Sequence, residues 1–307
     1  MDPKWTDGNE LEYLRQVLEN SSEVRKNPFT DRLEKAFIEK YKVKYAIAMN
    51  SGASGIHSAL VACGVRPGDE VITSPYSVLW DAGAVLIMGA KVVFADVKYG
   101  THNIDPTKVI EKISEKTKAI IPVSYHGLPC DIDELKEIGK KYNIPIIEDN
   151  AQTHLGEYKG RYVGTDADFA MFSLERTKHI SCHEGGVLLT NDNNLAAKAR
   201  KFGGGGFKNL TSDKSKLAAV IPSEFQSPDY KRHDSLGLNY RISEFCAAVA
   251  LAQFEMVEKK VKLRRDISKM YDEIFKNFEN FEPQEVPTGY THSYFTYSVK
   301  SPFEKLE

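Results

Sequence analysis

A lysine that follows a β-rich run offers the most distinctive chemistry in this sequence. Lys178 lies five residues after Ser173, which ends the run Phe169–Ser173. A lysine near the carboxyl edge of a sheet is partly withdrawn from water, which lowers the pKa of its amine and favours Schiff-base chemistry. Ser173 and Thr177 could add hydroxyl groups for a phosphate. The competing interpretation is an ordinary surface lysine in a hairpin loop.

An acidic residue and an amide follow a second β-rich run, Ile144–Glu148. There, Asp149 and Gln152 bring a carboxylate and an amide to the end of the strand. Ligands of parallel sheets bind at the carboxyl ends of the strands. A buried aspartate needs a cation or several hydrogen-bond donors, and a protonated pyridine nitrogen would serve. Asp149 could instead cap a following helix.

A third motif could hold a phosphate. Residues 50–55 read NSGASG and open a helix after the first β-rich run. Small residues let the backbone approach an anion, and a helix N-terminus presents unpaired N–H groups with a partial positive charge. The motif is neither a P-loop nor GxGxxG. An ordinary strand-to-helix turn with a serine cap remains open.

Alternating β-rich and helical segments must position these motifs. The β-rich runs are Tyr45–Met49, Glu70–Thr73, Lys91–Val97, Lys118–Val123, Ile144–Glu148, Phe169–Ser173 and Gly186–Thr190. Helical patterns cover residues 9–20, 30–41, 55–63 and 131–142. This alternation predicts an α/β fold with a mostly parallel central sheet of about seven strands covered by helices.

The pattern changes after residue 203. Residues 203–237 begin with four glycines and are predicted as a long loop. Residues 243–277 are predicted as one long helix, followed by a strand-like stretch at Tyr294–Lys300. We therefore expect a large cofactor-binding domain over residues 1–240 and, over residues 241–307, a long helix that leads into a smaller α+β domain.

Composition excludes several classes of partner. The 307 residues carry 41 basic and 43 acidic side chains, which are spread along the chain. This balance predicts neither a nucleic-acid partner nor an anionic membrane surface. No apolar run approaches the ~20 residues that cross a bilayer, and the N-terminus lacks a signal-peptide pattern. We expect a cytoplasmic protein.

Cysteines and histidines give no metal-binding or disulfide pattern. The widely spaced cysteines are expected to be reduced thiols: Cys63, Cys130, Cys182 and Cys246. The spacing of His154, His179 and His183 matches no zinc pattern, so no metal is expected and these side chains are predicted to form local hydrogen bonds.

Along the chain, the phosphate-binding motif comes first, then Asp149 with Gln152, then Ser173 with Lys178. In this order, the three motifs resemble the DegT/StrS-type sugar aminotransferases, a family of fold type I pyridoxal-phosphate (PLP) enzymes with the aspartate-aminotransferase-like fold. The resemblance runs from about residue 9 to the end of the chain. It includes Gly68-Asp69-Glu70-Val71-Ile72, Asn103-Ile104-Asp105-Pro106, residues 117–123 and Leu236-Gly237-Leu238-Asn239-Tyr240-Arg241.

The resemblance implies catalytic roles for three residues. Lys178 matches the lysine that carries pyridoxal 5'-phosphate as an internal aldimine and later acts as general base and acid. Asp149 matches the carboxylate paired with the pyridine nitrogen, and Gln152 the amide beside the ring. Related sugar dehydratases carry histidine at the lysine position, so Lys178 favours transamination.

The resemblance also implies how the phosphate is held. Gly52, Ala53 and Ser173 match phosphate-binding positions, with Ser54 close by. Asn239 matches an asparagine that reaches the phosphate from the neighbouring subunit, which implies a homodimer with shared active sites.

Three features depart from the family pattern. The aromatic residue that stacks on the ring is replaced by Val78, and Trp80 is the candidate to take over this role. Residues 174–176 lack the usual aromatic residues and proline. Relatives continue beyond position 307, so we expect a shortened small domain.

The resemblance implies transfer of an amino group from glutamate or glutamine to a nucleotide-linked keto-sugar. A keto-cyclitol or another non-nucleotide acceptor remains open, as does a non-catalytic PLP-fold sensor or regulatory protein. A dinucleotide-dependent oxidoreductase would need GxGxxG where this sequence reads NSGASG.

Overall fold

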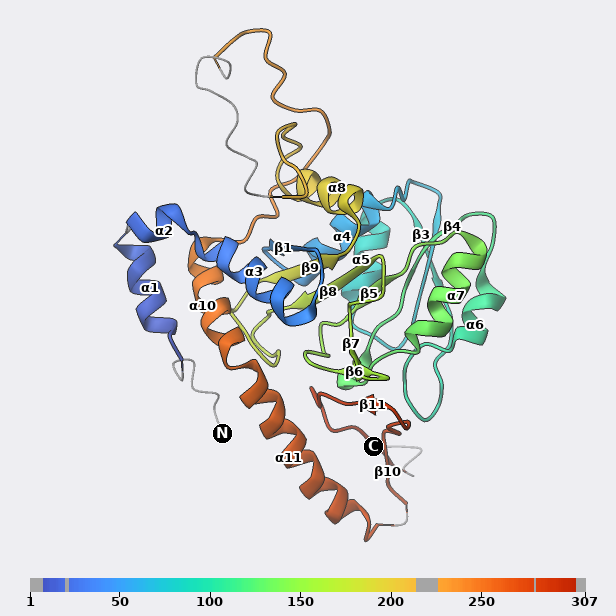
Figure 1. The fold of residues 1–307 in the computed structure, drawn as a ribbon. Coiled ribbons are helices and arrows are strands. Elements are labelled where there is room, and N and C mark those ends of the chain that lie inside the picture. Colours follow the sequence, from blue (N-terminus) through green and yellow to red (C-terminus); the bar gives the residue numbers. More distant parts are fainter. Residues whose placement is uncertain (1–7, 20–21, 214–225, 279, 302–307) are drawn as a thin grey trace, which may run out of the picture.

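The computed structural model describes residues 8–19, 22–213, 226–278 and 280–301 as an α/β fold (Figure 1). The helices are α1 (Glu10–Leu18), α2 (Ser22–Lys26), α3 (Phe29–Tyr41), α4 (Gly52–Ala62), α5 (Leu79–Ile87), α6 (Pro106–Lys112), the 3₁₀ turn η1 (Tyr125–Gly127), α7 (Ile132–Tyr142), α8 (Asn193–Gly203), α10 (Glu244–Glu255) and α11 (Val257–Phe275). The strands are β1 (Tyr45–Met49), β2 (Glu70–Thr73), β3 (Lys91–Phe94), β4 (Thr117–Ile121), β5 (Ile147–Asp149), β6 (Glu157–Tyr158), β7 (Arg161–Tyr162), β8 (Phe169–Ser173), β9 (Gly186–Thr190), β10 (Glu282–Pro283), β11 (Tyr290–Thr291) and β12 (Val299–Lys300).

Two sheets form the centre of the fold. Their strand orders are β1-β9-β8-β5 and β3-β2-β4. Parallel bridges between Ile120 and Ile146 and between Val123 and Asp149 join the two sheets edge to edge. Strand β9 runs antiparallel to both β8 and β1, whereas β5 is parallel to β8 and β2 is parallel to both of its neighbours. The predicted α/β class is confirmed, and the central sheet is mixed.

Alternate side chains of the central strands enter two hydrophobic cores. In β1, Ala46 and Ala48 belong to a core with residues of α3 and α10, while Ile47 and Met49 belong to a core with residues of α4 and α8. Successive side chains of a strand point to opposite faces, so both faces of this sheet need helical cover. Figure 1 shows these helices around the sheet.

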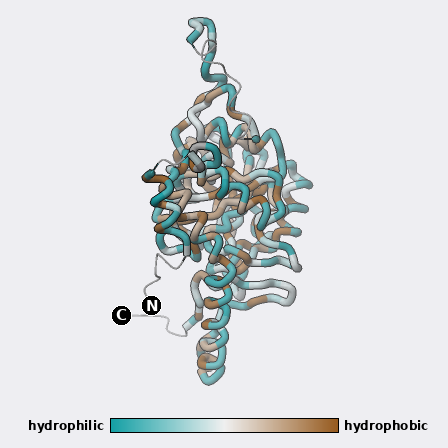
Figure 2. The backbone as a smooth tube through the Cα atoms, turned by 60° about the vertical axis from the view of Figure 1, so that its left-hand side comes forward, coloured by the Kyte–Doolittle hydropathy of each residue, from teal (hydrophilic) through white to brown (hydrophobic). Residues whose placement is uncertain are grey.

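The helix expected over residues 243–277 is two helices. Met256, with φ −101° and ψ 2°, separates α10 from α11. Its N–H donates to the carbonyl of Gln253 at 3.1 Å, which is the tighter 3₁₀ bonding pattern. Neither proline nor glycine marks this position, so the sequence gives no sign of the break. Figure 2 shows that α11 projects from the body and is largely hydrophilic.

The chain returns from α11 to the body of the fold. Strand β11 pairs with β6, and two arginines of α11 bind the segment beyond it. Arg264 donates to the carbonyl of Phe295 at 2.8 Å, and Arg265 donates to the carbonyl of His292 at 2.8 Å. The strand expected over Tyr294–Lys300 is limited to β12. Tyr294 adopts a positive φ of 50°, and residues 295–296 form a bend before the strand begins. The predicted domain division at residue 240 stays a prediction.

The expected long loop begins after α8. Residues 204–213 and 226–237 contain no helix or strand, and a bridge between Phe207 and His233 joins its two described arms. Residues 214–225 lie outside the described residues. Within the described ranges, none of the helices combines the length and the apolar character that a bilayer crossing requires.

Candidate active site

The three sequence motifs meet at one edge of the central sheet. Strand β5 ends there at Asp149, and β8 ends there at Ser173. Strand β9 begins at this edge, where Gly186 pairs with both Ser173 and Met49. The segments that follow β1, β5 and β8 therefore leave the sheet on the same side.

Lys178 lies half-buried in the loop between β8 and β9. Its backbone N–H donates to the carbonyl of Glu175 at 3.0 Å, and its Nζ lies 4.7 Å from the ring centroid of Phe295. Burial lowers the pKa of the Lys178 amine, and the charges of Asp149 and Glu175 oppose that shift. A lowered pKa increases the fraction of unprotonated amine that can act as a nucleophile or base.

Asp149 is a buried carboxylate with one firm hydrogen bond. Its side chain is 3% exposed, and its Oδ1 accepts from the Ala151 N–H at 2.8 Å. Burial raises the pKa of Asp149, while the Ala151 N–H and the charge of Lys178 act against that rise. The residues after Asp149 form turns, so the alternative role as a helix cap is wrong.

Gln152 is held by the backbone of η1. Its side chain is 6% exposed, and its Oε1 accepts from the His126 N–H at 2.8 Å. Because this bond occupies the amide oxygen, the NH₂ group of Gln152 is the part left to donate to a ligand.

The N-terminus of α4 is closed by a capping box. The Ser51 hydroxyl accepts from the Ser54 N–H at 3.1 Å, and the Ser54 hydroxyl accepts from the Ser51 N–H at 3.2 Å. The Ser54 hydroxyl is therefore engaged within the helix cap. The N–H groups of Gly52 and Ala53, in the first turn, are the ones oriented for an anion.

Ser173 lies beside this helix N-terminus. Its side chain is 7% exposed, and its hydroxyl accepts from the Glu175 N–H at 3.3 Å. A Cβ added to Gly52 would lie only 3.2 Å from the Cβ of Ser173. The absence of a side chain at Gly52 thus lets the hydroxyl and the first turn of α4 face the same space.

A second glycine brings β9 against the same turn, and its replacement gives a testable prediction. A Cβ on Gly186 would lie 2.6 Å from the carbonyl oxygen of Ser51 and 2.8 Å from the nitrogen of Gly52. We expect Gly186→Ala to displace the start of α4 and to lower the free energy of unfolding by about 1–3 kcal/mol, which urea denaturation would measure. Gly83→Ala is the control, because nothing lies within 4 Å of a Cβ there. Equal stability of the two variants would contradict the prediction.

Two predicted site residues, Trp80 and Asn239, have exposed side chains. The Trp80 side chain is 65% exposed, whereas its neighbour Asp81 is buried. Asn239 is exposed, and its carbonyl accepts from the Asn50 side chain at 3.5 Å. Ring stacking by Trp80 and phosphate binding by Asn239 both stay predictions.

The structure adds two residues that sequence reasoning missed. The Asp81 carboxyl group lies within hydrogen-bonding reach of Asp149, and Phe295 lies against Lys178. An aspartate in the first turn of a helix usually indicates a charge placed at the helix dipole, so its type and position gave no sign of burial. Phe295 is 117 residues beyond Lys178, and no local pattern connects the two.

The buried histidines near the site bind backbone carbonyls. His154 Nε2 lies 3.4 Å from the Ser173 oxygen, and His179 Nε2 lies 2.9 Å from the Ser293 oxygen. Burial lowers the pKa of His154 to about 4, so this ring is neutral near pH 7. Both histidines contribute local hydrogen bonds, as the sequence predicts.

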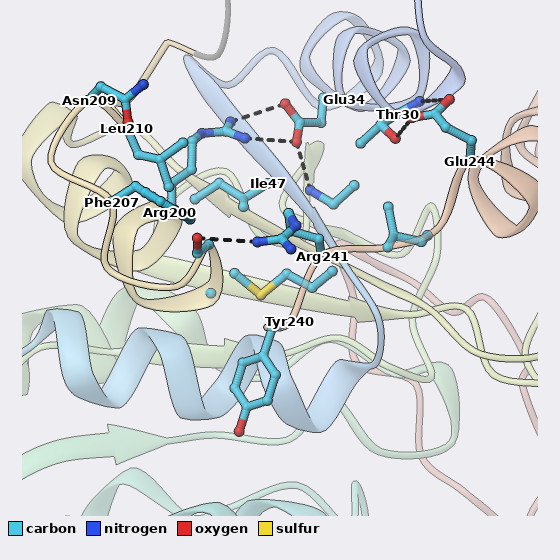
Figure 3. A pocket seen from close by; sticks show the side chains of 15 residues that line it. Thr30, Glu34, Ile47, Arg200, Phe207, Asn209, Leu210, Tyr240, Arg241 and Glu244 are labelled. Atoms are coloured by element: carbon cyan, nitrogen blue, oxygen red, sulfur yellow. Dashed lines mark hydrogen bonds and ion pairs between the residues drawn. The ribbon is translucent and has the colours of Figure 1, made fainter. Parts of the chain in front are cut away.

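A cavity of about 440 Å³ lies away from this site, between α3, α8 and residues 240–244 (Figure 3). Its wall includes an ion pair in which both Arg200 and Glu34 are under 10% exposed. The two guanidinium nitrogens each lie 3.0 Å from one carboxylate oxygen, and Arg200 also donates to the Ala46 carbonyl. The cavity lining does not include Lys178 or Asp149.

Breaking this ion pair should strongly destabilise the fold. Arg200→Ala leaves the Glu34 carboxylate buried without its cation, and we expect a loss of about 3–5 kcal/mol in the free energy of unfolding. Lys201→Ala is the control, because its partner Asp234 is half exposed and surface pairs contribute about 0–1 kcal/mol. Thermal or urea denaturation measures both, and a loss of less than 1 kcal/mol for Arg200→Ala would refute this account.

Both the sequence and the structure of this chain are similar to those of known aminotransferases. Residues 5–306 match the DegT/DnrJ/EryC1/StrS aminotransferase family. A GDP-perosamine synthase of Caulobacter vibrioides is 34% identical over 296 residues, which cover 96% of this chain and 75% of the relative. The structure is similar to the aminotransferase from Psychrobacter cryohalolentis, with a TM-score of 0.86, 28% identity and coverage of 99% of this chain and 78% of the other. It is also similar to NtdA from Bacillus subtilis with the bound cofactor PMP, with a TM-score of 0.78, 25% identity and coverage of 97% and 65%.

Proposed function

Because this chain belongs to the DegT/DnrJ/EryC1/StrS aminotransferase family, and is a PLP-dependent sugar aminotransferase, we propose that Lys178 and Asp149 are its catalytic residues and that its acceptor is a keto-sugar linked to GDP. The observation that carries the residue assignment is the convergence of three features at one sheet edge. These are a partly buried amine, a buried carboxylate and the N-terminus of α4.

The residues at this edge fit pyridoxal phosphate. The first-turn N–H groups of Gly52 and Ala53 and the Ser173 hydroxyl offer donors for a phosphate. Asp149 is buried with one backbone donor, so a protonated ring nitrogen would complete its hydrogen bonding. The NH₂ group of Gln152 offers a donor for the ring oxygen.

When bound, the cofactor supplies an electron sink for the carbon that loses a proton. The chain supplies the groups that move and stabilise charge around it. Lys178 has an amine whose pKa burial lowers, so it can take a proton from the substrate carbon as general base and return it as general acid. The Ala151 N–H and the charge of Lys178 favour the ionised form of Asp149, and this carboxylate would keep the ring nitrogen protonated.

The name of the Caulobacter relative, GDP-perosamine synthase, supports GDP as the first sugar carrier to test. The proposed amino donor is glutamate or glutamine. A keto-cyclitol or another non-nucleotide acceptor is the second candidate. A non-catalytic sensor or regulatory role is less well supported, because it would not require the lowered pKa of Lys178 beside Asp149.

We also propose a cytoplasmic homodimer in which Asn239 reaches the phosphate of the partner subunit. Asn239 is exposed, and two apolar neighbours support a covered surface here, with Leu236 93% exposed and Leu238 45% exposed. An exposed apolar patch often marks a subunit interface. The free state of all four cysteines is consistent with the proposed compartment.

Isotope transfer tests the reaction directly. Protein loaded with PLP is incubated with amine-labelled ¹⁵N-glutamate or ¹⁵N-glutamine. Each acceptor is tested in turn, namely keto-sugars linked to GDP, UDP or dTDP and a keto-cyclitol, and mass spectrometry follows the label. We expect ¹⁵N in the GDP-linked sugar and none with Lys178→Ala. Label in a sugar on another nucleotide would overturn the choice of carrier alone. Failure to label any keto-sugar or keto-cyclitol, with no keto acid formed, would overturn the enzymatic proposal.

A further inference from the structure

Asp81 is a buried carboxyl group that the proposed chemistry has not yet used. It occupies the first turn of α5 and is 2% exposed. The Ser77 hydroxyl donates to its Oδ2 at a long 3.4 Å. Its Oδ1 is buried and, among the residues that the structure describes, receives no hydrogen bond from a donor. An unsatisfied buried carboxylate is unfavourable unless it is protonated or paired.

The group that Asp81 faces is Asp149. The two carboxyl groups lie within hydrogen-bonding reach of each other, and each is almost fully buried. Two carboxylates can form such a bond only when one of them carries a proton, and like charges at this separation do not both ionise readily. The two aspartates therefore act as one unit that retains a proton.

The surroundings decide where the proton resides. Three groups face Asp81: Asp149 from β5, Lys178 from the loop after β8, and the Ser77 hydroxyl that precedes α5. Burial, and then the charge of Asp149, raise the pKa of Asp81 well above its ordinary value. Asp149 has the Ala151 N–H and is the main charge opposite Lys178, so it is the better anion. Asp81 is thus the donor of the pair and Asp149 the acceptor.

We propose that Asp81 is a positioning residue for the cofactor, whose carboxyl group donates a hydrogen bond to Asp149 and holds that carboxylate facing the ring nitrogen. The inference rests on the proposed function, in which Asp149 binds the pyridine nitrogen. Asp81 itself does not touch the cofactor. Without this donor, one oxygen of Asp149 is left unsatisfied, and the carboxylate is free to turn towards Lys178.

The proposal predicts a pH step in cofactor affinity. When Asp81 ionises, it can no longer donate a hydrogen bond to Asp149, so affinity should decrease as pH rises through the pKa of Asp81. That pKa is raised from its ordinary value, so the step belongs above the range in which an exposed aspartate titrates. Asp81→Asn keeps an amide donor at the same place but has no ionisable group, so it should retain affinity and lose the step.

The experiment measures the dissociation constant of pyridoxamine phosphate against pH by calorimetry. This ligand has an amine in place of the aldehyde, so it cannot condense with Lys178, and its affinity isolates the contacts to the ring and phosphate. We expect Asp81→Asn to bind within about threefold of the wild-type chain and Asp81→Leu, which lacks any donor, to bind roughly 10–100-fold more weakly. Glu148→Gln is the matched control, because Glu148 is equally buried one residue before Asp149 but accepts from the Gly164 N–H instead.

The outcomes separate this inference from the proposed function. If the wild-type chain does not bind pyridoxamine phosphate, or if Asp149→Asn binds it as tightly as wild type, the proposed function is overturned. If those two results are as expected but Asp81→Asn shows the wild-type pH step, the role of Asp81 alone is overturned. Loss of the step in Asp81→Asn, with the step intact in Glu148→Gln, supports it.

Discussion

Replacement of Lys178 by alanine is expected to remove nearly all aminotransferase turnover. The variant loses both the amine that binds the cofactor covalently and the group that moves the proton. Positioned proton transfer alone contributes about 10²–10⁴-fold, so kcat should fall by at least that factor. Steady-state formation of the keto acid from glutamate measures the loss.

Two further measurements test the reason for that loss. Added methylamine should restore part of the rate in Lys178→Ala, because a free amine can replace the missing base. Lys118→Ala, which removes an exposed lysine on β4, is the control for loss of charge and should turn over normally. Wild-type turnover in Lys178→Ala would refute the assignment.

The second large effect is expected for Asp149→Asn, which preserves shape and removes charge. A hydrogen bond to a charged group contributes about 1.5–3 kcal/mol, so the rate of a single turnover with glutamate should fall roughly 10–150-fold. A stopped-flow record of the cofactor absorbance gives this rate. Glu148→Gln, the neighbouring buried carboxyl on the other side of β5, should react at the wild-type rate. If both variants lost the same factor, general disturbance of β5 would explain the result better than a contact to the ring.

Much of the central sheet was predictable because each strand is encoded by its local sequence. The runs at Tyr45–Met49, Phe169–Ser173 and Gly186–Thr190 are strands with the expected bounds, since each is a short apolar run between turn residues. Strand direction was not predictable in this way. The short connection from Ser173 to Gly186 permits either direction, and β9 is antiparallel because of the pairs it forms with β1 and β8.

The candidate site shows the same limit. Lys178, Asp149 and Gln152 could be selected because each follows a strand, and the structure brings their segments to one edge. Asp81 could not be selected, since its burial depends on how α5 packs against α4, β2 and β3. Trp80 was proposed to stack on the ring because it is the aromatic residue nearest to Val78, yet its side chain is 65% exposed. The neighbouring Asp81 is the residue that is buried. The break at Met256 was missed because neither proline nor glycine marks it.

Arginine contacts from α11 connect this helix to the segment that packs beside the Lys178 amine. Arg264 binds the carbonyl of Phe295, whose ring lies 4.7 Å from Lys178 Nζ. The ring that packs beside the lysine amine is therefore held, through its own backbone, by a helix that lies outside the central sheet. Part of the packing around Lys178 thus depends on where α11 lies relative to the edge of the sheet.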